Sequence, residues 1–307
     1  MVLVSQPVQP EDATRMVNFD PVIYVVKTSD MSLVWKGRLQ TQGRIDWVSQ
    51  ILWIPNTPYI ALVGQTESTT RIVLIRSTDG KVLWEKASFY EYPAAHYVSY
   101  DPFQKVLLVR EGNQIGLQAY QVPEMKPVGQ YMPEEKRQGC CLVHALAWNA
   151  QGVAAIGWER YGSQRYHLIV WEGGNSQGRT MRLPYNRADT AFDYLVWGPR
   201  DEVAVMLIPA TASSSDVYTI VFMDAQTGNV RWTVTAREYP VTGLAWLNGR
   251  GWLLGSGGEV RLYSQPMDKY EVLRKQDGRF LMSLSADASG TKWLTVLHTR
   301  AELWEWK

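Results

Sequence analysis

The sequence lacks most of the features that assign a protein to a biochemical class. Its 307 residues include only two cysteines, Cys140 and Cys141, which are adjacent and therefore form no staple between distant segments. No apolar run reaches the ~18 residues expected of a membrane span. The 31 basic and 30 acidic residues give a formal net charge of +1. Charge therefore provides no preference for nucleic acid or for an anionic membrane.

Signals for targeting and for metal chemistry are scarce as well. Residues 1–10 have no basic n-region, and their apolar stretch is too short for a signal peptide. No glycine-rich phosphate loop opens a helix, and neither His-x-His nor Glu-x-x-His occurs. We therefore expect a cytoplasmic protein that binds no cofactor and no metal.

Aromatic residues are abundant, with 14 Trp and 16 Tyr, and many of them recur at a fixed period. Four segments share one pattern: Ser49–Pro55, His144–Asn149, Asp193–Pro199 and Thr242–Asn248. Two weaker copies are His96–Pro102 and Leu281–Asp287. The fifth residues of the six copies are Trp53, Tyr100, Trp148, Trp197, Trp246 and Ser285, at separations of 47, 48, 49, 49 and 39 residues. Repeats of 40–50 residues made of short apolar strands are typical of β-propellers.

Each repeat contains four predicted strands, which is one propeller blade. A hairpin with a tight turn joins the third and fourth strands, as in Ile72–Trp84, Ile220–Trp232 and Ile23–Trp35. We predict an all-β chain with a single β-propeller of four-stranded blades. Six blades are favoured, over residues 45–90, 91–132, 140–184, 188–236, 238–276 and 278–307.

The last predicted blade stops before a fourth strand. Ser32–Gly37 is a candidate to complete it, because propellers commonly close by letting an N-terminal strand join the final blade. Val22–Thr28 is then one strand too many, so a seventh, incomplete blade is the alternative. We expect residues 19–307 to form the propeller domain and residues 1–18 to be a loose, flexible arm.

Two sets of residues resemble the WD40-like and quinoprotein-like (PQQ-like) β-propeller superfamily. Leu168–Glu172 and Leu303–Glu305 are similar to the Trp-Asp ending of a WD40 strand, with Glu replacing Asp. Asp224–Trp232 and Thr78–Trp84 are similar to the quinoprotein-type repeat. The resemblance suggests a cofactor beside Cys140–Cys141, because quinoprotein alcohol dehydrogenases carry adjacent cysteines there. The chain is about half the length of such enzymes, so we interpret the pair as two reduced, buried thiols.

A ring of polar residues is the main candidate site. Four positions before the repeated aromatic residue stand Ser49, His96, His144, Asp193 and Thr242, with Leu281 interrupting the series. In radially aligned strands these residues share one level near a mouth of the central channel, where they could bind a ligand. Alternatively, they form structural hydrogen bonds between neighbouring strands and blades. The repeated Trp53, Tyr100, Trp148, Trp197 and Trp246 are interpreted as structural blade anchors that fill the space between blades.

These features favour a non-enzymatic scaffold or adaptor subunit that binds other protein subunits, without nucleic-acid binding or membrane insertion. Almost all of the sequence is devoted to blade packing, and a stiff ring presents large loop-bearing surfaces. The alternative is a small-molecule-binding or lyase/hydrolase-type propeller. Its site would lie at the channel mouth, with His96, His144 and Asp193 in proton transfer or ligand orientation.

Overall fold

The structure is a computed structural model. It describes residues 2–5, 21–66, 69–89, 97–112, 114–134, 140–159, 161–188, 190–198, 201–209, 218–236, 241–256, 258–264, 269–275, 281–287, 291–297 and 301–305. These residues belong to two compact units, Met1–Met132 and Pro133–Lys307. Every regular element among them is a β-strand, and the consecutive strands within each group below pair antiparallel. No helix in the described ranges is long and apolar enough to cross a membrane.

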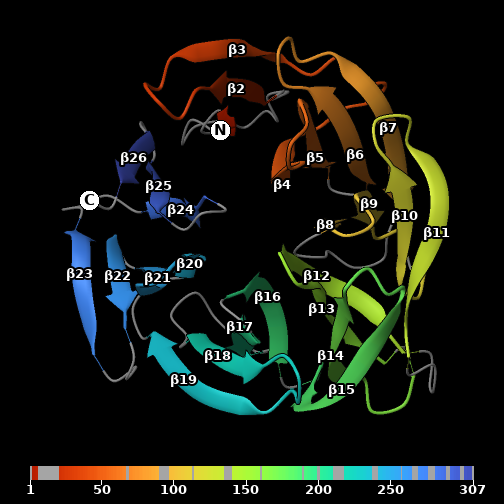
Figure 1. The fold of residues 1–307 in the computed structure, drawn as a ribbon, viewed down its shortest axis with the longest axis vertical. Helices are drawn as coiled ribbons and strands as arrows, with labels where there is room; N and C mark the ends of the chain where they lie inside the picture. Colours follow the sequence, from red (N-terminus) through yellow and green to blue (C-terminus); the bar gives the residue numbers. More distant parts are fainter. Residues whose placement is uncertain are drawn as a thin grey trace, which may run out of the picture. The chain divides into compact units, whose positions relative to one another are not determined.

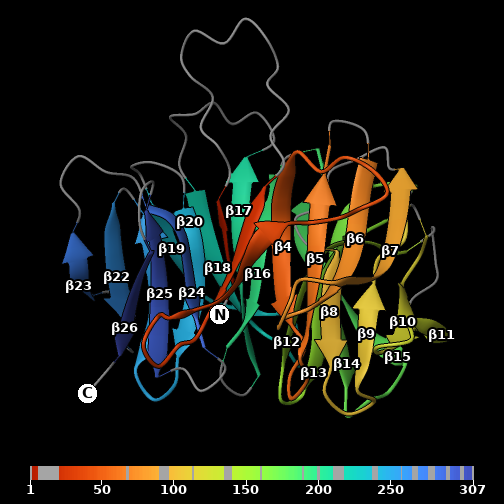
Figure 2. The same cartoon turned by 90° about the horizontal axis from the view of Figure 1, so that it is seen from above.

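The first unit contains three consecutive groups of strands (Figure 1). The first group is β1 (Val2–Ser5), β2 (Val22–Val26) and β3 (Leu33–Arg38). The second is β4 (Trp47–Trp53), β5 (Tyr59–Gln65), β6 (Thr69–Arg76) and β7 (Val82–Phe89), seen in Figure 2. The third is β8 (Val98–Asp101), β9 (Val106–Val109), β10 (Leu117–Gln121) and β11 (Lys126–Pro133).

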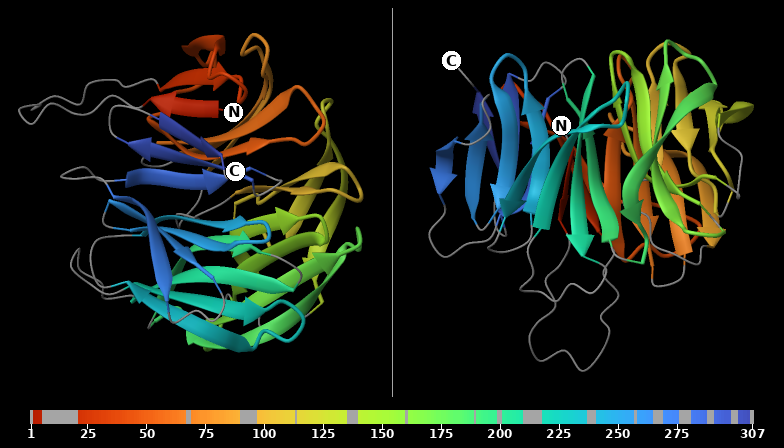
Figure 3. Two further views of the ribbon diagram at one scale, coloured as in Figure 1. Left: turned by 60° about the vertical axis from the view of Figure 1, so that its left-hand side comes forward. Right: turned by 90° about the horizontal axis from the view of Figure 1, so that it is seen from below.

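The second unit contains four groups. These are β12 (Leu142–Asn149), β13 (Gly152–Trp158), β14 (Arg165–Glu172) and β15 (Gln177–Asn186), then β16 (Thr190–Trp197), β17 (Glu202–Pro209), β18 (Tyr218–Asp224) and β19 (Val230–Ala236). They are followed by β20 (Val241–Leu247), β21 (Gly251–Ser256), β22 (Glu259–Tyr263) and β23 (Tyr270–Lys275), then β24 (Leu281–Ala286), β25 (Lys292–Leu297) and β26 (Ala301–Glu305). The first strands β12, β16, β20 and β24 are neighbours in that order, as Figure 3 illustrates for the green-to-blue sheets.

The predicted repeat of four antiparallel strands is confirmed in the five groups that begin with β4, β8, β12, β16 and β20. The last group has three described strands, as the sequence predicts for the final repeat. The surplus strand at Val22–Val26 belongs to a group of its own with β1 and β3. The predicted pairing of Ser32–Gly37 with the last blade, and the choice between six and seven blades, stay predictions.

The N-terminal residues differ in part from the predicted loose arm. Val2–Ser5 forms strand β1 and pairs with Val22–Val25, so this portion of residues 1–18 is part of a sheet. Its apolar sequence, Val-Leu-Val, suits a strand because β-branched residues pack well on a pleated surface. The remainder of the predicted arm, residues 6–18, lies outside the described residues, and the domain boundary at residue 19 stays a prediction.

The core is built from second strands that are apolar on both faces. All seven residues of β13 and all six of β21 are buried, and so are six of the seven residues of β5. An alternating strand would leave every other residue in water, whereas a continuous apolar strand requires cover on both faces. Each sheet therefore needs a neighbour on each side.

The sheets meet that requirement by packing face to face in chain order within each unit. In the first unit, Ile23 and Val25 of β2 pack with Ile60 and Leu62 of β5. In the second unit, Phe222 of β18 packs against Trp252 of β21 with ring centroids 5.1 Å apart. The core of the following sheet continues into Leu284 of β24 and Trp293 of β25. Burial of such apolar surface is the main term that stabilises the fold.

The predicted hairpins are present. Arg76 accepts a main-chain hydrogen bond from Gly80, whose φ of +70° closes the turn between β6 and β7 at little steric cost. The outer tryptophan Trp84 lies 5.5 Å from the ring of Tyr120 in the next sheet. Trp35 of β3 covers Gly80, where a Cβ would lie 2.0 Å from the indole. These contacts place Trp35 and Trp84 in the packing between consecutive groups of strands.

Gly243 permits the close approach of two first strands, and its replacement is the first test of this packing. A Cβ at Gly243 would lie 2.6 Å from Leu284 Cβ and 2.7 Å from the Leu284 nitrogen and oxygen. We expect Gly243→Ala to lower the free energy of unfolding by about 1–3 kcal/mol, because the backbone must shift. Gly129→Ala, with nothing within 4 Å, is the matched control and should change it by no more than about 0.5 kcal/mol. Equal losses in denaturant titrations of the two variants would contradict this packing.

Tyr166 of β14 provides a test at alkaline pH. Its hydroxyl donates to the carbonyl of Thr190 at 3.2 Å, and burial raises its pKa to about 12. Between pH ~10 and this value the unfolded chain releases a proton that the folded chain keeps, so stability is lost as pH rises. We expect Tyr166→Phe to make this decline shallower by up to about 1.4 kcal/mol per pH unit. Denaturant titrations at several pH values measure the slope, and identical slopes would contradict the assignment.

Candidate functional site

The repeated aromatic residues do not share one environment. Tyr100 and Trp197 are buried, and Trp148 and Trp246 are half-buried. Trp53, in contrast, is 38% exposed, so the expectation that every anchor fills the core is wrong at this position. Trp53 is the last residue of β4, and its indole Nε1 donates to the carbonyl of Thr57 in the following turn at 3.1 Å. That turn holds the ring at the strand end, away from the space between sheets.

The predicted polar ring coincides with a recurring irregularity of the first strands. In β4, Val48 pairs with Gly64 and Gln50 with Val63, so Ser49 is an extra residue. The same shift occurs at His144 in β12, at Asp193 and Tyr194 in β16 and at Thr242 in β20. Each is a β-bulge, which leaves a residue out of the ladder and turns its side chain away from the regular pleat. Every described member of the ring therefore lies at a bulge.

In the last repeat the bulge lies one residue after Leu281, the position that corresponds to Ser49 in the repeated sequence segment. Leu281 pairs with Leu297 and Ser283 with Val296, so Met282 is the extra residue. The structural equivalent of the aromatic anchor is then Ala286, which pairs with Trp293, and not Ser285. The sequence copy is degenerate there, and only strand pairing reveals the correct register.

At His144 the bulge serves a contact between sheets. The half-buried imidazole Nε2 donates to the main-chain carbonyl of Phe192 in β16, the first strand of the next sheet. An edge contact with Trp158 at 5.4 Å also holds the ring. This arrangement favours the structural interpretation of His144.

In the first unit the neighbour of the bulged residue makes the equivalent link. Gln50 Nε2 donates to the carbonyl of Val98 at 2.7 Å, while its Oε1 accepts from the Tyr97 and Val98 amides. Ser49 itself is exposed and donates to the Val63 carbonyl of its own sheet at 3.3 Å. The Gln50 side chain thus joins β4 to the start of β8 through hydrogen bonds to main-chain atoms of Tyr97 and Val98.

The ligand-binding role of the ring stays a prediction. The backbones of Asp193 and Thr242 are placed in β16 and β20, but their side chains are outside what the structure describes. His96 lies in the segment 90–96, which is also outside the described residues. Convergence of His96, His144 and Asp193 on one ligand is therefore neither shown nor contradicted.

A surface cavity of about 490 Å³ lies elsewhere in the first unit. It is lined by Trp35, Gly37, Arg38, Gln40, Asp79, Gly80, Lys81 and Val82. Its one lining carboxylate, Asp79, pairs with Arg76 and accepts from the Lys81 amide, and these bonds lower its pKa to about 2. No residue of the predicted ring lines it, and no motif in the sequence predicts this cavity.

One segment outside the predicted ring has the residue spacing of a nucleophile motif. Gly174–Gly178 reads Gly-Asn-Ser-Gln-Gly, the Gly-x-Ser-x-Gly spacing that needs a strand-to-helix turn in hydrolases. The segment connects β14 to β15 in a hairpin, and Asn175 caps the turn by accepting from the Gln177 amide at 3.0 Å. Its geometry is that of a tight turn between strands.

A buried acid and a buried histidine form a charged cluster at one end of the β12–β15 sheet. His167 of β14 donates from Nε2 to Glu159 Oε1 at 3.2 Å, and Arg182 Nη2 is 3.8 Å from the same oxygen. Burial acts to raise the pKa of Glu159, but hydrogen bonds from Ser163, His167 and the Arg165 amide hold it below its usual value. The carboxylate is therefore ionised, and the nearby Arg182 guanidinium compensates its charge.

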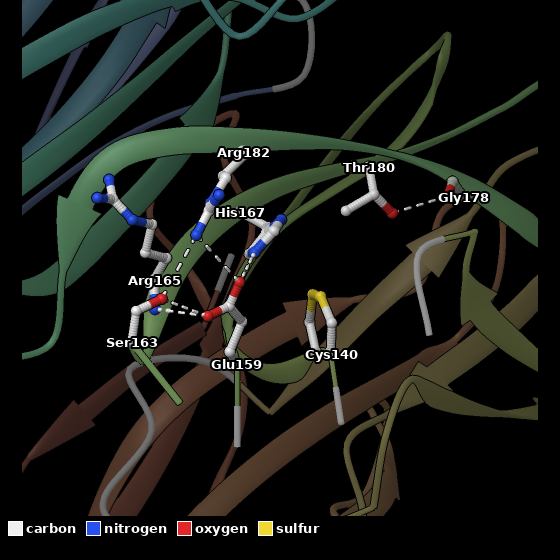
Figure 4. Close-up of a disulfide and its surroundings, with 9 residues drawn as sticks. Cys140, Glu159, Ser163, Arg165, His167, Gly178, Thr180 and Arg182 are labelled. Atoms are coloured by element: carbon white, nitrogen blue, oxygen red, sulfur yellow. Dashed lines mark hydrogen bonds and ion pairs between the residues drawn. A yellow bond between two sulfur atoms is a disulfide. The ribbon is translucent and has the colours of Figure 1, made fainter. Parts of the chain in front are cut away.

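The adjacent cysteines lie beside this cluster, just before β12 (Figure 4). They are joined as a vicinal disulfide, whereas the sequence predicts two reduced thiols. Both are fully buried, as predicted. Gly157 of β13 makes room for them, because a Cβ there would lie 2.8 Å from the Cβ of Cys141.

No model of a known protein family matches the chain, and no curated protein matches it either. Solved structures do. The Dos1 propeller is 8% identical with a TM-score of 0.60, over 94% of this chain and 74% of that one. A chain of the outer coat vertex of COPII on membranes is 14% identical with a TM-score of 0.63, over 99% and 80%. A chain of the COPII coat assembled on membranes gives the same values over 99% of this chain and 45% of its own length.

The fold is that of a β-propeller. At such low identity the likeness concerns the fold alone. It confirms the coarse part of the resemblance stated from the sequence. The finer assignment to WD40-like or quinoprotein-like propellers is not decided by these comparisons.

The link made by His144 leads to a stability prediction. We expect His144→Ala to lower the free energy of unfolding by about 1–3 kcal/mol, because the Phe192 carbonyl loses its partner between two sheets. Ser49→Ala removes the bulge residue whose bond stays within one sheet, and should cost no more than about 0.5 kcal/mol. Denaturant titration of both variants is the measurement. A neutral His144→Ala would indicate that the imidazole is available for another role.

Proposed function

We propose that this propeller is a non-enzymatic scaffold that binds other protein subunits. The observation that carries the proposal is the position of its exposed apolar side chains. Among the described residues, most of them lie on the outermost strand of a sheet: Leu33, Val34, Leu83, Val230, Tyr270 and Val272. Apolar groups that remain in water on an outer strand favour protein contacts, since their burial by a partner is favourable.

Strand β23 offers the best-defined example. Tyr270 and Val272 are 48% and 43% exposed and point to the same face, because side chains two apart in a strand share a face. The Arg261 guanidinium lies over the Tyr270 ring, 4.8 Å from its centroid. An aromatic residue with a stacked arginine and a neighbouring aliphatic side chain is the kind of group that contributes most to protein interfaces.

The inter-sheet contacts supply the stiffness that such a role requires. Buried hydrogen bonds such as Trp252 Nε1 to Glu202 Oε1, at 2.7 Å, join consecutive sheets of the second unit. A surface that is already rigid loses little conformational entropy on binding. Propellers of similar fold also occur in an assembled coat, which supports the same proposal. A cytoplasmic location, expected from the sequence, remains part of this proposal.

The test combines identification of partners with a surface variant. Native purification of the full chain from its source, with quantitative mass spectrometry, should recover a protein at near-equimolar stoichiometry. Val272→Glu places a charge on the exposed face of β23 and should weaken that association about tenfold or more. Glu271→Gln, on the same strand with its side chain on the opposite face, is the matched control and should bind as the wild type does.

The expected result includes unchanged thermal unfolding of both variants, since neither position belongs to the core. Recovery of the chain alone at monomer mass would contradict the scaffold role. Equal partner recovery with Val272→Glu and Glu271→Gln would contradict the assignment of β23 and leave the other outer strands to be tested by the same substitution.

A further inference from the structure

Three strand ends bring the cysteine pair and the His167–Glu159 pair together. Leu142 pairs with Trp158, and Gly157 with His167, so the start of β12, the end of β13 and the start of β14 lie at one end of the sheet. Cys141, Glu159 and His167 stand at even offsets in this register and therefore share one face. Figure 4 shows the cysteine sulfurs and the His167 ring on the same side, with Glu159 beside them.

The two cysteine sulfurs and a His167 ring nitrogen are close enough together to bind one metal ion. One sulfur from each cysteine and one ring nitrogen of His167 all lie within 4.8 Å of one another, and all three residues are buried. Thiolate and imidazole are the donors preferred by thiophilic ions such as Zn²⁺, with bond lengths of about 2.0–2.3 Å. Small side-chain movements suffice to bring three donors from this separation to a common ion.

Glu159 is placed as an outer-shell partner of the histidine. It accepts from His167 Nε2 at 3.2 Å, while its other oxygen accepts from Ser163 Oγ at 2.7 Å. In that tautomer His167 Nδ1 carries the lone pair that coordinates a metal, which is the carboxylate–histidine–metal arrangement common in proteins. Arg182 balances the charge of Glu159. Two thiolates and one divalent ion are neutral together, so metal binding adds no net charge to the buried cluster.

We propose that reduction of the Cys140–Cys141 disulfide creates a buried site for one thiophilic divalent metal ion, held by both thiolates and His167. An external thiol supplies the two electrons: the disulfide and two thiol molecules give two cysteine thiols and one external disulfide. Binding of the ion then releases two protons as the cysteines become thiolates. The site is thus available in the reduced state and closed in the oxidised state.

The test uses the fact that the chain contains no other cysteines. Full-length protein is reduced with dithiothreitol, freed of reductant without oxygen, and titrated with Co²⁺ as a spectroscopic probe for Zn²⁺. The expected result is one equivalent of Co²⁺ per chain with a thiolate-to-metal charge-transfer band, and displacement of Co²⁺ by Zn²⁺. The oxidised wild type should show no band, and this comparison requires no substitution.

Variants then identify the ligands. The double variant Cys140→Ser/Cys141→Ser should lose the charge-transfer band completely. His167→Asn removes a proposed ligand and should weaken Co²⁺ binding by at least about 10–100-fold. Glu159→Gln should weaken it about 10–100-fold through the orientation of His167. Glu172→Gln, a partly exposed carboxylate of the same sheet, is the matched control and should leave the affinity unchanged. Circular dichroism and thermal unfolding establish that each variant is folded.

Two results would overturn the proposal. The first is reduced wild-type protein that shows two titratable thiols per chain but binds no more metal than the double cysteine variant, which would make the pair a redox couple only. The second is a folded His167→Asn variant with wild-type affinity, which would indicate a dithiol site without the histidine. Neither result depends on the scaffold role, which is measured by partner recovery.

Discussion

The architecture depends on second strands that cannot be exposed to water on either face. β13 and β21 are entirely buried, and β5 nearly so. A lone four-stranded sheet with such a strand would expose apolar surface on both sides, so it is stable only when another sheet covers each face. This constraint explains why one repeat does not fold alone and why consecutive sheets pack face to face within each unit. It also explains the glycines at the closest approaches, such as Gly243 opposite Leu284.

The first strands solve a different problem, because they carry polar groups near the core. In four of the repeats a bulge takes a residue out of the ladder: at Ser49, at His144, at Asp193 and Tyr194, and at Thr242. At His144 the freed side chain joins the carbonyl of the next first strand, and beside Ser49 the amide of Gln50 makes the comparable link. Part of the polar ring therefore links neighbouring sheets, and its members are spaced by 47, 48, 49 and 49 residues.

The proposed scaffold role and the proposed metal site involve different parts of the sheets. Outer strands keep apolar side chains such as Val272 in water, where a partner is able to bury them. Strand ends bury Cys140, Cys141, His167 and Glu159, where desolvation makes each unpaired charge costly and favours compensated clusters. The proposed metal site would join the residues that precede β12 to β14 through Cys140, Cys141 and His167.

The repeat, the strand order and the hairpins are predictable from the sequence alone, because turn residues and apolar runs are properties of contiguous segments. The sequence also locates the polar ring by position. Pairing across the sheet decided what the sequence could not: that Ser49 and His144 are bulged, that the last copy is shifted to Met282, and that Trp53 is exposed although Trp197 is buried. The sequence predicts buried cysteines, but it does not predict their neighbours His167 and Glu159, because no local spacing connects these residues to residue 140. They meet because antiparallel register returns distant residues to the same end of a sheet.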